Sequence, residues 1–315
     1  MKQLDIAIPC FNEQECVRRV FAEISRVMSG IPSWSYTVLF IDDGSRDKTL
    51  LEIKALIREL KEQPNGQCRV EYISFSRNFG KEAAIYAGLQ NSHGDAIVFM
   101  DADLQDPPEL LLQMIEGLEE GFDCVAAQRT SRKGEPVIRS WFANKFYALM
   151  NKFSDVTMNP GARDFRMMSA HMRDALLGLC ERERFSKGLF AWVGFNTKWI
   201  EFPIVPRAAG TTKWSFFALY KYALSGIVGF TTAPLKIAAS FGLFTVLIAI
   251  AYFLYRVLKY GFTVKPAEIA IVLILFFSGV IILFLGVIGE YLSRIYSEVK
   301  QRPIYITREK SRLED

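Results

Sequence analysis

Histidine and cysteine are scarce in this chain of 315 residues, and their spacing forms no metal-binding pattern. There are two histidines and five cysteines, and no cysteine belongs to a CxxC pair or to a Cys/His cluster at zinc spacing. This excludes a zinc-finger module and leaves few residues for a Ser-His-Asp triad. The scattered cysteines are typical of reduced thiols in a cytosolic compartment.

Three common nucleotide-binding or hydrolase fingerprints are also missing. No GxGxxG follows an apolar run, and neither GxxxxGK[ST] nor GxSxG occurs. The chain therefore lacks the signature of a dinucleotide fold, of a P-loop NTPase and of an α/β-hydrolase. The formal charge of +4 is too small to indicate a nucleic-acid partner.

Hydrophobic residues are plentiful and concentrate near the C-terminus. They make up 50% of the chain, which excludes a disordered protein. Residues 237–255 and 269–289 carry no charged side chain. Each run has about the 20 apolar residues that a helix needs to cross a bilayer. The sequence therefore predicts two transmembrane helices. The alternative is a pair of buried core helices.

The basic residues around these runs predict the membrane orientation. The second run is followed by Arg294, Lys300, Arg302, Arg308, Lys310 and Arg312, whereas Arg256, Lys259 and Lys265 lie between the runs. The positive-inside rule then places the tail in the cytoplasm. Two spans return the chain to the side it left, and residues 1–5 lack the longer apolar region of a signal peptide. The N-terminal part is expected to be cytoplasmic.

Residues 214–233, just before the first run, contain several aromatic side chains together with Lys221, and Lys213 directly precedes them. This pattern favours amphipathic helices lying in the membrane interface. The alternative is an ordinary surface helix. The predicted organisation is a cytoplasmic domain over residues 1–213, interface helices over 214–233, two membrane helices over 234–292 and a basic tail over 293–315.

The N-terminal part alternates short apolar runs with helical periodicity. Strands are expected over residues 4–9, 36–41, 69–75, 96–100 and 124–128. Helices are expected over residues 13–28, 49–60, 81–90 and 107–118, the last with Asp106 as its N-cap. This βαβ alternation predicts an α/β domain with a mainly parallel sheet and helices on both faces. Ligands of such sheets bind beyond the carboxyl ends of the strands.

Polar side chains follow the predicted strands at that edge. Asp101 and Asp103 come after an apolar run, and with the amide oxygen of Gln105 they suit Mg²⁺ or Mn²⁺. The alternative is a solvated turn. Asp42 and Asp43 end the second predicted strand. One could accept hydrogen bonds from a nucleotide base or ribose, and the other could cap the turn that follows.

Several ordered motifs give the chain a specific family resemblance. They are IPCFNE at 8–13, IDDGS at 41–45 and MDADLQDP at 100–107. Further ones are SFSRNFGKEA at 74–83, GARDFR at 161–166, RFSKG at 184–188, GTTKW at 210–214 and GEYLSRIY at 289–296. Together they resemble glycosyltransferase family 2, with the GT-A fold, and in particular the two-span polyprenyl-phosphate glycosyltransferases of bacteria, relatives of dolichol-phosphate mannose synthase.

The resemblance implies an enzyme that moves a sugar from a nucleotide donor to a lipid. Glucose or N-acetylglucosamine from a UDP-sugar and undecaprenyl phosphate are the implied substrates, with Mg²⁺ or Mn²⁺ held by Asp101, Asp103 and Gln105. The acceptor phosphate is already ionised at neutral pH, so one in-line displacement with inversion is expected. Alternatives are a 4-amino-arabinose-type donor, a non-catalytic nucleotide-sugar sensor, and a processive polysaccharide synthase, for which the usual QxxRW segment is missing.

The resemblance also implies roles for further residues. The nucleoside is expected near Pro9, Asn12, Glu13, Asp42 and Asp43. Arg129 is expected to hold the lipid phosphate, with Arg139 as the second arginine. The remaining candidate substrate contacts are Lys81, Asp164, Arg166, Lys187 and Lys213. For Asp164 and Arg166 the alternative is a salt bridge inside a small strand. A homo-oligomer such as a tetramer, a flippase and a second glycosyltransferase of a cell-envelope pathway are possible partners.

Overall fold

A computed structural model describes most of the chain. The described residues are 1–62, 66–129, 151, 157, 159, 161–179, 181–203, 229, 231, 233–260 and 266–311. Arg139, Lys213 and nearly all of the expected interface segment lie outside them. The four described cysteines, Cys10, Cys16, Cys68 and Cys124, form no disulfide with one another.

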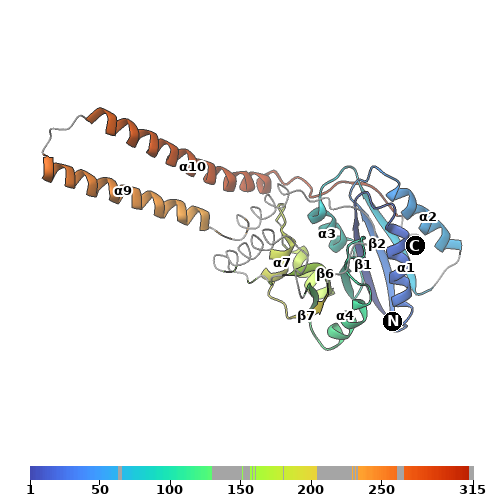
Figure 1. Cartoon of the computed structure of the whole chain (residues 1–315). Coiled ribbons are helices and arrows are strands. Elements are labelled where there is room, and N and C mark those ends of the chain that lie inside the picture. Colours follow the sequence, from blue (N-terminus) through green and yellow to red (C-terminus); the bar gives the residue numbers. More distant parts are fainter. Residues whose placement is uncertain are drawn as a thin grey trace.

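The N-terminal part folds into an α/β domain from which a long helical hairpin projects (Figure 1). The strands are β1 Lys2–Cys10, β2 Trp34–Asp42, β3 Cys68–Phe75, β4 Ala96–Phe99, β5 Cys124–Arg129, β6 Ala162–Ser169, β7 Thr197–Phe202 and β8 Thr307–Lys310. The helices are α1 Val17–Met28, α2 Thr49–Glu62, α3 Lys81–Gln90, α4 Leu110–Glu119, α6 Ala170–Leu177, α7 Ser186–Trp192, α9 Ala233–Tyr260 and α10 Pro266–Lys300.

The strands form one 8-stranded sheet in the order β7-β5-β6-β4-β1-β2-β3-β8. β1 pairs in parallel with β2 and β4, β2 with β3, and β5 with β7. β6 pairs antiparallel with both β4 and β5, and β8 pairs antiparallel with β3. The expected mainly parallel sheet is confirmed, with two antiparallel strands that the βαβ pattern does not predict.

Alternation along the strands sends side chains into two cores. Ile6 and Val38 pack with α1, α2 and α4 on one face, whereas Ala7 and Leu39 pack with α3, α6 and α7 on the other. Both faces are buried because the central strands are almost continuously apolar. The expectation of helices on both faces is confirmed.

The prediction that Asp106 caps the following helix is wrong. Helix α4 begins at Leu110, and its N-cap position is Glu109. The two residues after Asp106 are prolines, which have no backbone N–H for a capping side chain to bind. Asp106 is instead 1% exposed and accepts a hydrogen bond from Arg163.

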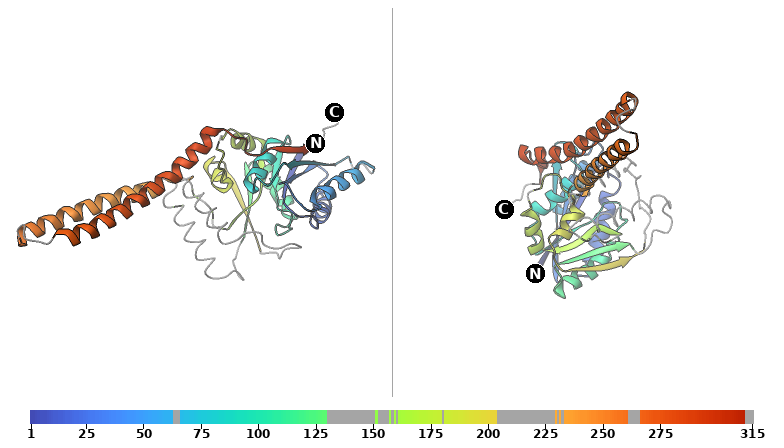
Figure 2. Two further views of the ribbon diagram at one scale, coloured as in Figure 1. Left: turned by 90° about the horizontal axis from the view of Figure 1, so that it is seen from above. Right: turned by 90° about the vertical axis from the view of Figure 1, so that its left-hand side faces the viewer.

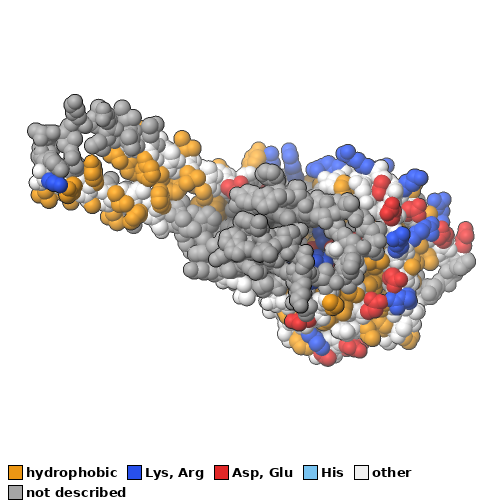
Figure 3. Space-filling model, in the orientation of Figure 1, with side chains coloured by type: hydrophobic (Ala, Val, Ile, Leu, Met, Phe, Trp, Pro, Cys, Tyr) orange, Lys and Arg blue, Asp and Glu red, His pale blue; other side chains and the backbone are white. Residues whose placement is uncertain are grey.

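The hairpin consists of α9 and α10, which lie side by side in Figure 1 and in the further views of Figure 2. Phe241 of α9 meets Phe284 of α10 edge to face, with ring centroids 6.5 Å apart. The visible hairpin surface is mostly apolar (Figure 3). Within the described residues, length and composition alone identify one helix that could cross a membrane, Phe276–Lys300. That a second span crosses through α9 stays a prediction.

After α10 the chain runs back to the α/β domain (Figure 2). Thr307–Lys310 forms β8 at the edge of the sheet, where Ile73 of β3 is paired with Lys310. Part of the predicted basic tail therefore completes the catalytic domain, because it covers an edge that β3 would otherwise expose.

Candidate active site

The carboxyl edge of the parallel strands carries a partly buried cluster of charges. The Nζ atom of Lys81, at the start of α3, lies 2.7 Å from Oδ1 of Asp101 and 2.7 Å from Oδ2 of Asp164. Asp101 follows β4, and Asp164 lies on the neighbouring strand β6. Three segments distant in sequence thus meet at one ammonium group.

Arg163 extends this cluster toward α4. Its Nε lies 2.9 Å from Oδ1 of Asp106, and its Nη2 lies 3.7 Å from Oδ2 of Asp101. Two cations, Lys81 and Arg163, therefore face three carboxylates, those of Asp101, Asp106 and Asp164. Lys187 and Arg166 add positive charge on the Asp164 side, where both lower the pKa of its carboxyl.

The pKa values of the buried members follow from these contacts. Burial by itself would raise the pKa of Asp164, but Lys81 and then Lys187 outweigh it and hold that pKa well below its usual range. Burial raises the pKa of Asp106, and Arg163 opposes this only in part. Burial would lower the pKa of Lys81, but Asp101 and Asp164 raise it. Lys81 therefore stays an ammonium ion.

Asp103 and Gln105 form a tight turn next to this cluster. Oδ1 of Asp103 accepts a hydrogen bond of 3.1 Å from the backbone N–H of Gln105, and Leu104 between them has a φ of 55°. Nη2 of Arg129, at the end of β5, donates to Oε1 of Gln105 over 3.3 Å. The structure thus brings Arg129, a predicted site residue, to the turn that carries Asp103 and Gln105.

The described residues contain no group of three or more His, Cys, Asp or Glu side chains arranged as a metal site. The predicted donor set consists of two carboxylates, Asp101 and Asp103, and the amide oxygen of Gln105. Magnesium is usually bound through one or two carboxylates together with waters and substrate phosphates. This donor set therefore fits a divalent ion that arrives with a diphosphate.

The predicted nucleoside residues lie at the ends of β1 and β2. The backbone N–H of Asn12 donates to Oγ of Ser45 over 2.9 Å, and its Oδ1 accepts from the backbone N–H of Arg46 over 2.8 Å. The N–H of Glu13 donates to Oγ1 of Thr49 over 2.8 Å. These bonds join the loop after Pro9 to the turn after β2, so one preformed edge is built from both.

Asp42 and Asp43 stabilise this edge by accepting hydrogen bonds from the turns that follow β2 and β3 and from β3 itself. Asp42 accepts hydrogen bonds from the backbone N–H of Ser45, 3.0 Å, and from Oγ of Ser74, 2.7 Å. Asp43 accepts from the backbone N–H groups of Phe79, 2.6 Å, and Gly80, 2.9 Å. The turn that Asp43 holds leads directly into α3 and Lys81. A direct contact of either carboxylate with a nucleoside stays a prediction.

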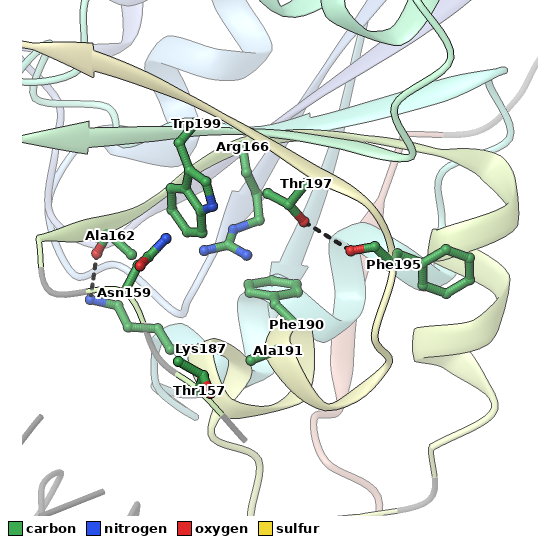
Figure 4. Close-up of a pocket in the computed structure, with 10 residues that line it drawn as sticks. All are labelled: Thr157, Asn159, Ala162, Arg166, Lys187, Phe190, Ala191, Phe195, Thr197 and Trp199. Carbon is green, nitrogen blue, oxygen red and sulfur yellow. Dashed lines mark hydrogen bonds between the residues drawn. The ribbon is translucent and has the colours of Figure 1, made fainter. Parts of the chain in front are cut away.

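Arg166 and Lys187, also predicted, line one cavity of about 240 Å³ between β6, β7 and α7 (Figure 4). The guanidinium of Arg166 stacks 4.1 Å from the ring centroid of Phe190, and Nζ of Lys187 donates to the carbonyl oxygen of Ala162 over 3.2 Å. Asp164 is ion-paired with Lys81 at 2.7 Å, and Arg166 is among the cations that lower the pKa of the Asp164 carboxyl. The alternative of an Asp164–Arg166 salt bridge stays a prediction.

Arg163, Phe190 and Trp199 are site residues that the sequence reasoning did not single out. Arg163 lies inside the GARDFR motif, which offered a signal. Phe190 and Trp199 had none, because their position depends on how α7 packs against β6 and β7.

The sequence itself falls into a known family. Residues 5–176 match glycosyl transferase family 2, and residues 233–295 match the GtrB C-terminal hairpin. The chain belongs to glycosyl transferase family 2 and is a glycosyltransferase. The mainly parallel sheet agrees with the GT-A fold implied by the resemblance.

Relatives are similar over nearly the whole chain. The chain is 43% identical to "Putative glycosyltransferase CsbB" of Bacillus subtilis (strain 168), covering 98% of this chain and 93% of that protein. It is 37% identical to "SfII prophage-derived bactoprenol glucosyl transferase" of Shigella flexneri, covering 98% and 99%. Among solved structures, glucosyl-3-phosphoglycerate synthase from Mycobacterium tuberculosis aligns with a TM-score of 0.46 and 17% identity, covering 72% of this chain and 78% of that one.

Proposed function

We propose that this glycosyltransferase moves glucose or N-acetylglucosamine from a UDP-sugar to undecaprenyl phosphate, or a similar polyprenyl phosphate, at the cytoplasmic face of the bacterial plasma membrane. The observation that carries the proposal is the cluster of charges formed by Lys81, Asp101, Asp164, Arg163 and Asp106, which lies beside the turn of Asp103. This cluster belongs to a family 2 chain that continues into an apolar hairpin. The bactoprenol glucosyl transferases among its relatives support the lipid acceptor.

Asp101, Asp103 and Gln105 are the residues proposed to hold Mg²⁺ or Mn²⁺. The bound ion would neutralise the charge that develops on the departing diphosphate. Arg129 contacts Gln105, so its guanidinium lies close enough to share that task or to hold the acceptor phosphate, as the resemblance implies. Lys81 and Arg163 orient the carboxylate of Asp101, and a bound divalent ion would share its oxygens with them.

The chemistry needs no strong general base. An oxygen of the acceptor phosphate forms a bond to the anomeric carbon, and the bond from that carbon to the diphosphate breaks with its electron pair. UDP leaves, and the sugar inverts its configuration. Since the phosphate monoester is ionised at neutral pH, no proton has to be removed. The protein supplies orientation and charge, which are the main sources of rate acceleration in such displacements.

The hairpin would hold the catalytic domain at the membrane surface, where the lipid acceptor is found. A polyprenyl chain stays in lipid while its phosphate reaches the catalytic domain, so tethering that domain beside the bilayer raises the encounter rate. We propose that α9 and α10 both span the membrane, with the interface segment 214–233 lying between them and the catalytic domain. The product, a polyprenyl-phosphate sugar, suits a later step of cell-envelope glycan modification that needs a flippase and a second glycosyltransferase.

A panel of radiolabelled nucleotide sugars tests this proposal. The purified full chain is incubated with undecaprenyl phosphate and Mg²⁺ or Mn²⁺, and label in the organic phase is counted. We expect transfer from UDP-glucose or UDP-N-acetylglucosamine. A 4-amino-arabinose-type donor serves as the second candidate. Absence of a lipid product with every donor would overturn the proposal, and an Asp103→Asn variant that keeps its cellular role would point to a sensor.

A further inference from the structure

The cavity beside α7 lies next to the charged cluster but is separate from it. Ala162 and Arg166 of β6 both line the cavity, although the pairing of β6 with β5 shifts register between them. Asp164 contacts Lys81 in the cluster, and Arg166 lies two residues further along, roughly 7 Å away. A group bound in the cavity would therefore sit beside the proposed diphosphate site.

A small residue leaves room for this cavity near one end of the sheet, where β7 is the edge strand. Ala126 of β5 is paired with Arg166 of β6 on one side and with Trp199 of β7 on the other. Because Ala126 has only a methyl group, space remains between the guanidinium and the indole. Helix α7 closes the opposite side with Lys187 and Phe190, and the four larger side chains point into the same space in Figure 4.

The charge of the lining selects an anion. Among the described residues that line the cavity, Arg166 and Lys187 are charged, and none is acidic. The ammonium of Lys187 donates to a backbone carbonyl rather than to a carboxylate. Asp164, beside the cavity, is ion-paired with Lys81 at 2.7 Å, and Lys187 and Arg166 also lower the pKa of its carboxyl. Asn159, Thr157 and Thr197 add polar groups that can bind phosphate oxygens.

The size and the aromatic walls narrow the ligand further. About 240 Å³ is below the range of pockets that enclose drug-sized ligands, so a whole UDP-sugar or a long prenyl chain does not fit. A phosphate group and the first few carbons attached to it do fit, with Trp199 and Phe190 as apolar walls. We propose that this cavity binds the phosphate monoester head of the acceptor, with Lys187 and Arg166 as its cations.

This inference rests on the proposed function but can be tested without catalysis. Binding of farnesyl phosphate to the detergent-solubilised full chain is measured by calorimetry in the absence of any sugar donor. Inorganic phosphate and farnesol are the two reference ligands. Lys187→Met removes the ammonium from the cavity, and Lys187→Arg restores a charge. Lys198→Met is the matched control, because Lys198 lies beside Trp199 in sequence but pairs with Glu120 outside the cavity.

We expect Lys187→Met to weaken farnesyl phosphate binding about tenfold or more, the effect of losing one hydrogen bond to a charged group. Lys187→Arg should recover most of the affinity, and Lys198→Met should stay within about threefold of the unmodified protein. Inorganic phosphate should show the same dependence on Lys187 with weaker binding, whereas farnesol should show none. A second variant, Trp199→Ala, should reduce the advantage of farnesyl phosphate over inorganic phosphate.

Unchanged binding of farnesyl phosphate to Lys187→Met would overturn the proposal, as would an equal loss of UDP binding in that variant, which would assign the cavity to the donor. If sugar transfer occurs and Lys187→Met leaves the KM for the acceptor unchanged, the cavity proposal fails alone. If no sugar transfer occurs but farnesyl phosphate binds as described, the proposed function fails and the anion cavity stands.

Discussion

Lys81 is the residue that links two carboxylates of the charged cluster. It joins Asp101 and Asp164 through two contacts of 2.7 Å, although these residues come from different elements. Without it, two carboxylates would face each other without their shared cation. Breaking a buried ion pair by removing one partner costs about 3–5 kcal/mol, and less when the group is partly exposed. The side chain of Lys81 is 31% exposed.

We therefore expect Lys81→Met to lower the free energy of unfolding by about 1–3 kcal/mol, measured by denaturant titration of the detergent-solubilised chain. Lys2→Met is the control, because Lys2 is mostly exposed and lies 3.7 Å from Glu119. That control should change stability by less than about 0.5 kcal/mol. Equal effects of the two substitutions would contradict the central position of Lys81.

Asp103 is the residue whose charge, rather than shape, the proposed reaction needs. Asn at this position keeps the oxygen that accepts the Gln105 N–H but loses the negative charge. We expect Asp103→Asn to lower sugar transfer by a factor on the order of 10² to 10³, with weaker Mn²⁺ binding seen by electron paramagnetic resonance. Asp174→Asn, an exposed site next to Arg173, should leave both unchanged. Full activity of Asp103→Asn would exclude a metal role for this carboxylate.

Asp43 gives the catalytic domain a specific pH dependence. Burial raises its pKa to about 6, although hydrogen bonds from Phe79 and Gly80 oppose the shift. The folded state therefore takes up a proton at a higher pH than the unfolded chain does. Asp43 then makes stability fall as the pH rises from about 4 to about 6, by roughly 1.4 kcal/mol per pKa unit, or about 3 kcal/mol in total.

Asp43→Asn should remove this contribution. We expect the stability of the unmodified chain, relative to the variant, to decrease between pH 4 and pH 6 and to stay level above pH 7, as measured by denaturant titrations at each pH. A relative stability that rises with pH in this window would contradict the raised pKa.

Much of the site could be predicted at the residue scale, but not its contacts. Asp101, Asp103, Gln105 and Arg129 were expected at one edge because they follow strands, and the structure places them there. The link from Lys81 to Asp164 could not be predicted, because it depends on β6 entering the sheet next to β4.

At the scale of elements, β8 connects the end of the membrane hairpin to the catalytic sheet. The ring of Tyr305 stacks on Phe75 of β3 with centroids 4.6 Å apart, and its hydroxyl donates to Oε1 of Gln90 over 2.9 Å. Lys54 of α2 lies 2.7 Å from Glu309 of β8. The backbone N–H of Ser76 donates to the carbonyl oxygen of Ile306, so the segment that leads into β8 also supports the turn before Lys81.

Tyr305→Ala should loosen this edge. We expect a loss of about 1–3 kcal/mol from the missing ring contact and hydrogen bond, together with faster amide hydrogen exchange over Cys68–Phe75. Ile306→Ala is the control, since its side chain is exposed, and it should leave exchange in β3 unchanged. If the two variants exchange alike, β8 contributes little to the sheet.

The elements that were predicted correctly have regular local patterns. Helix α3 has the expected bounds, and the strands over β1 to β5 lie within a few residues of the expected ranges. The strands β6, β7 and β8 were not predicted because polar or charged residues interrupt them, as in the ARDFRMMS segment of β6. Their pairing is set by tertiary contacts rather than by hydrophobic alternation.

At the scale of the whole molecule, the C-terminal end of α10 contacts the segment that leads into α7. The backbone N–H of Arg182 donates to Oε1 of Glu298 over 2.8 Å, and Arg294 lies 3.7 Å from Glu183. The same segment continues into Lys187 and the anion cavity. The hairpin therefore fixes the orientation of the cavity side of the domain relative to the proposed membrane.

Cysteine labelling tests whether this hairpin crosses the membrane twice. We expect Lys259→Cys, at the far end of α9, to react with an impermeant maleimide added outside intact cells. Arg308→Cys, in β8, should react only after permeabilisation. Reaction of both positions from the same side would contradict the two-span arrangement.

The most direct test of the proposed sugar transfer to a lipid phosphate follows the phosphorus atoms during the reaction. Phosphorus NMR of the purified chain with UDP-glucose or UDP-N-acetylglucosamine, undecaprenyl phosphate and Mg²⁺ distinguishes a phosphate monoester from a diester. We predict that the lipid monoester signal disappears while a lipid diester and UDP appear in equal amounts, with the sugar inverted. Release of UDP without a diester, or an unchanged spectrum with both donors, would contradict this prediction.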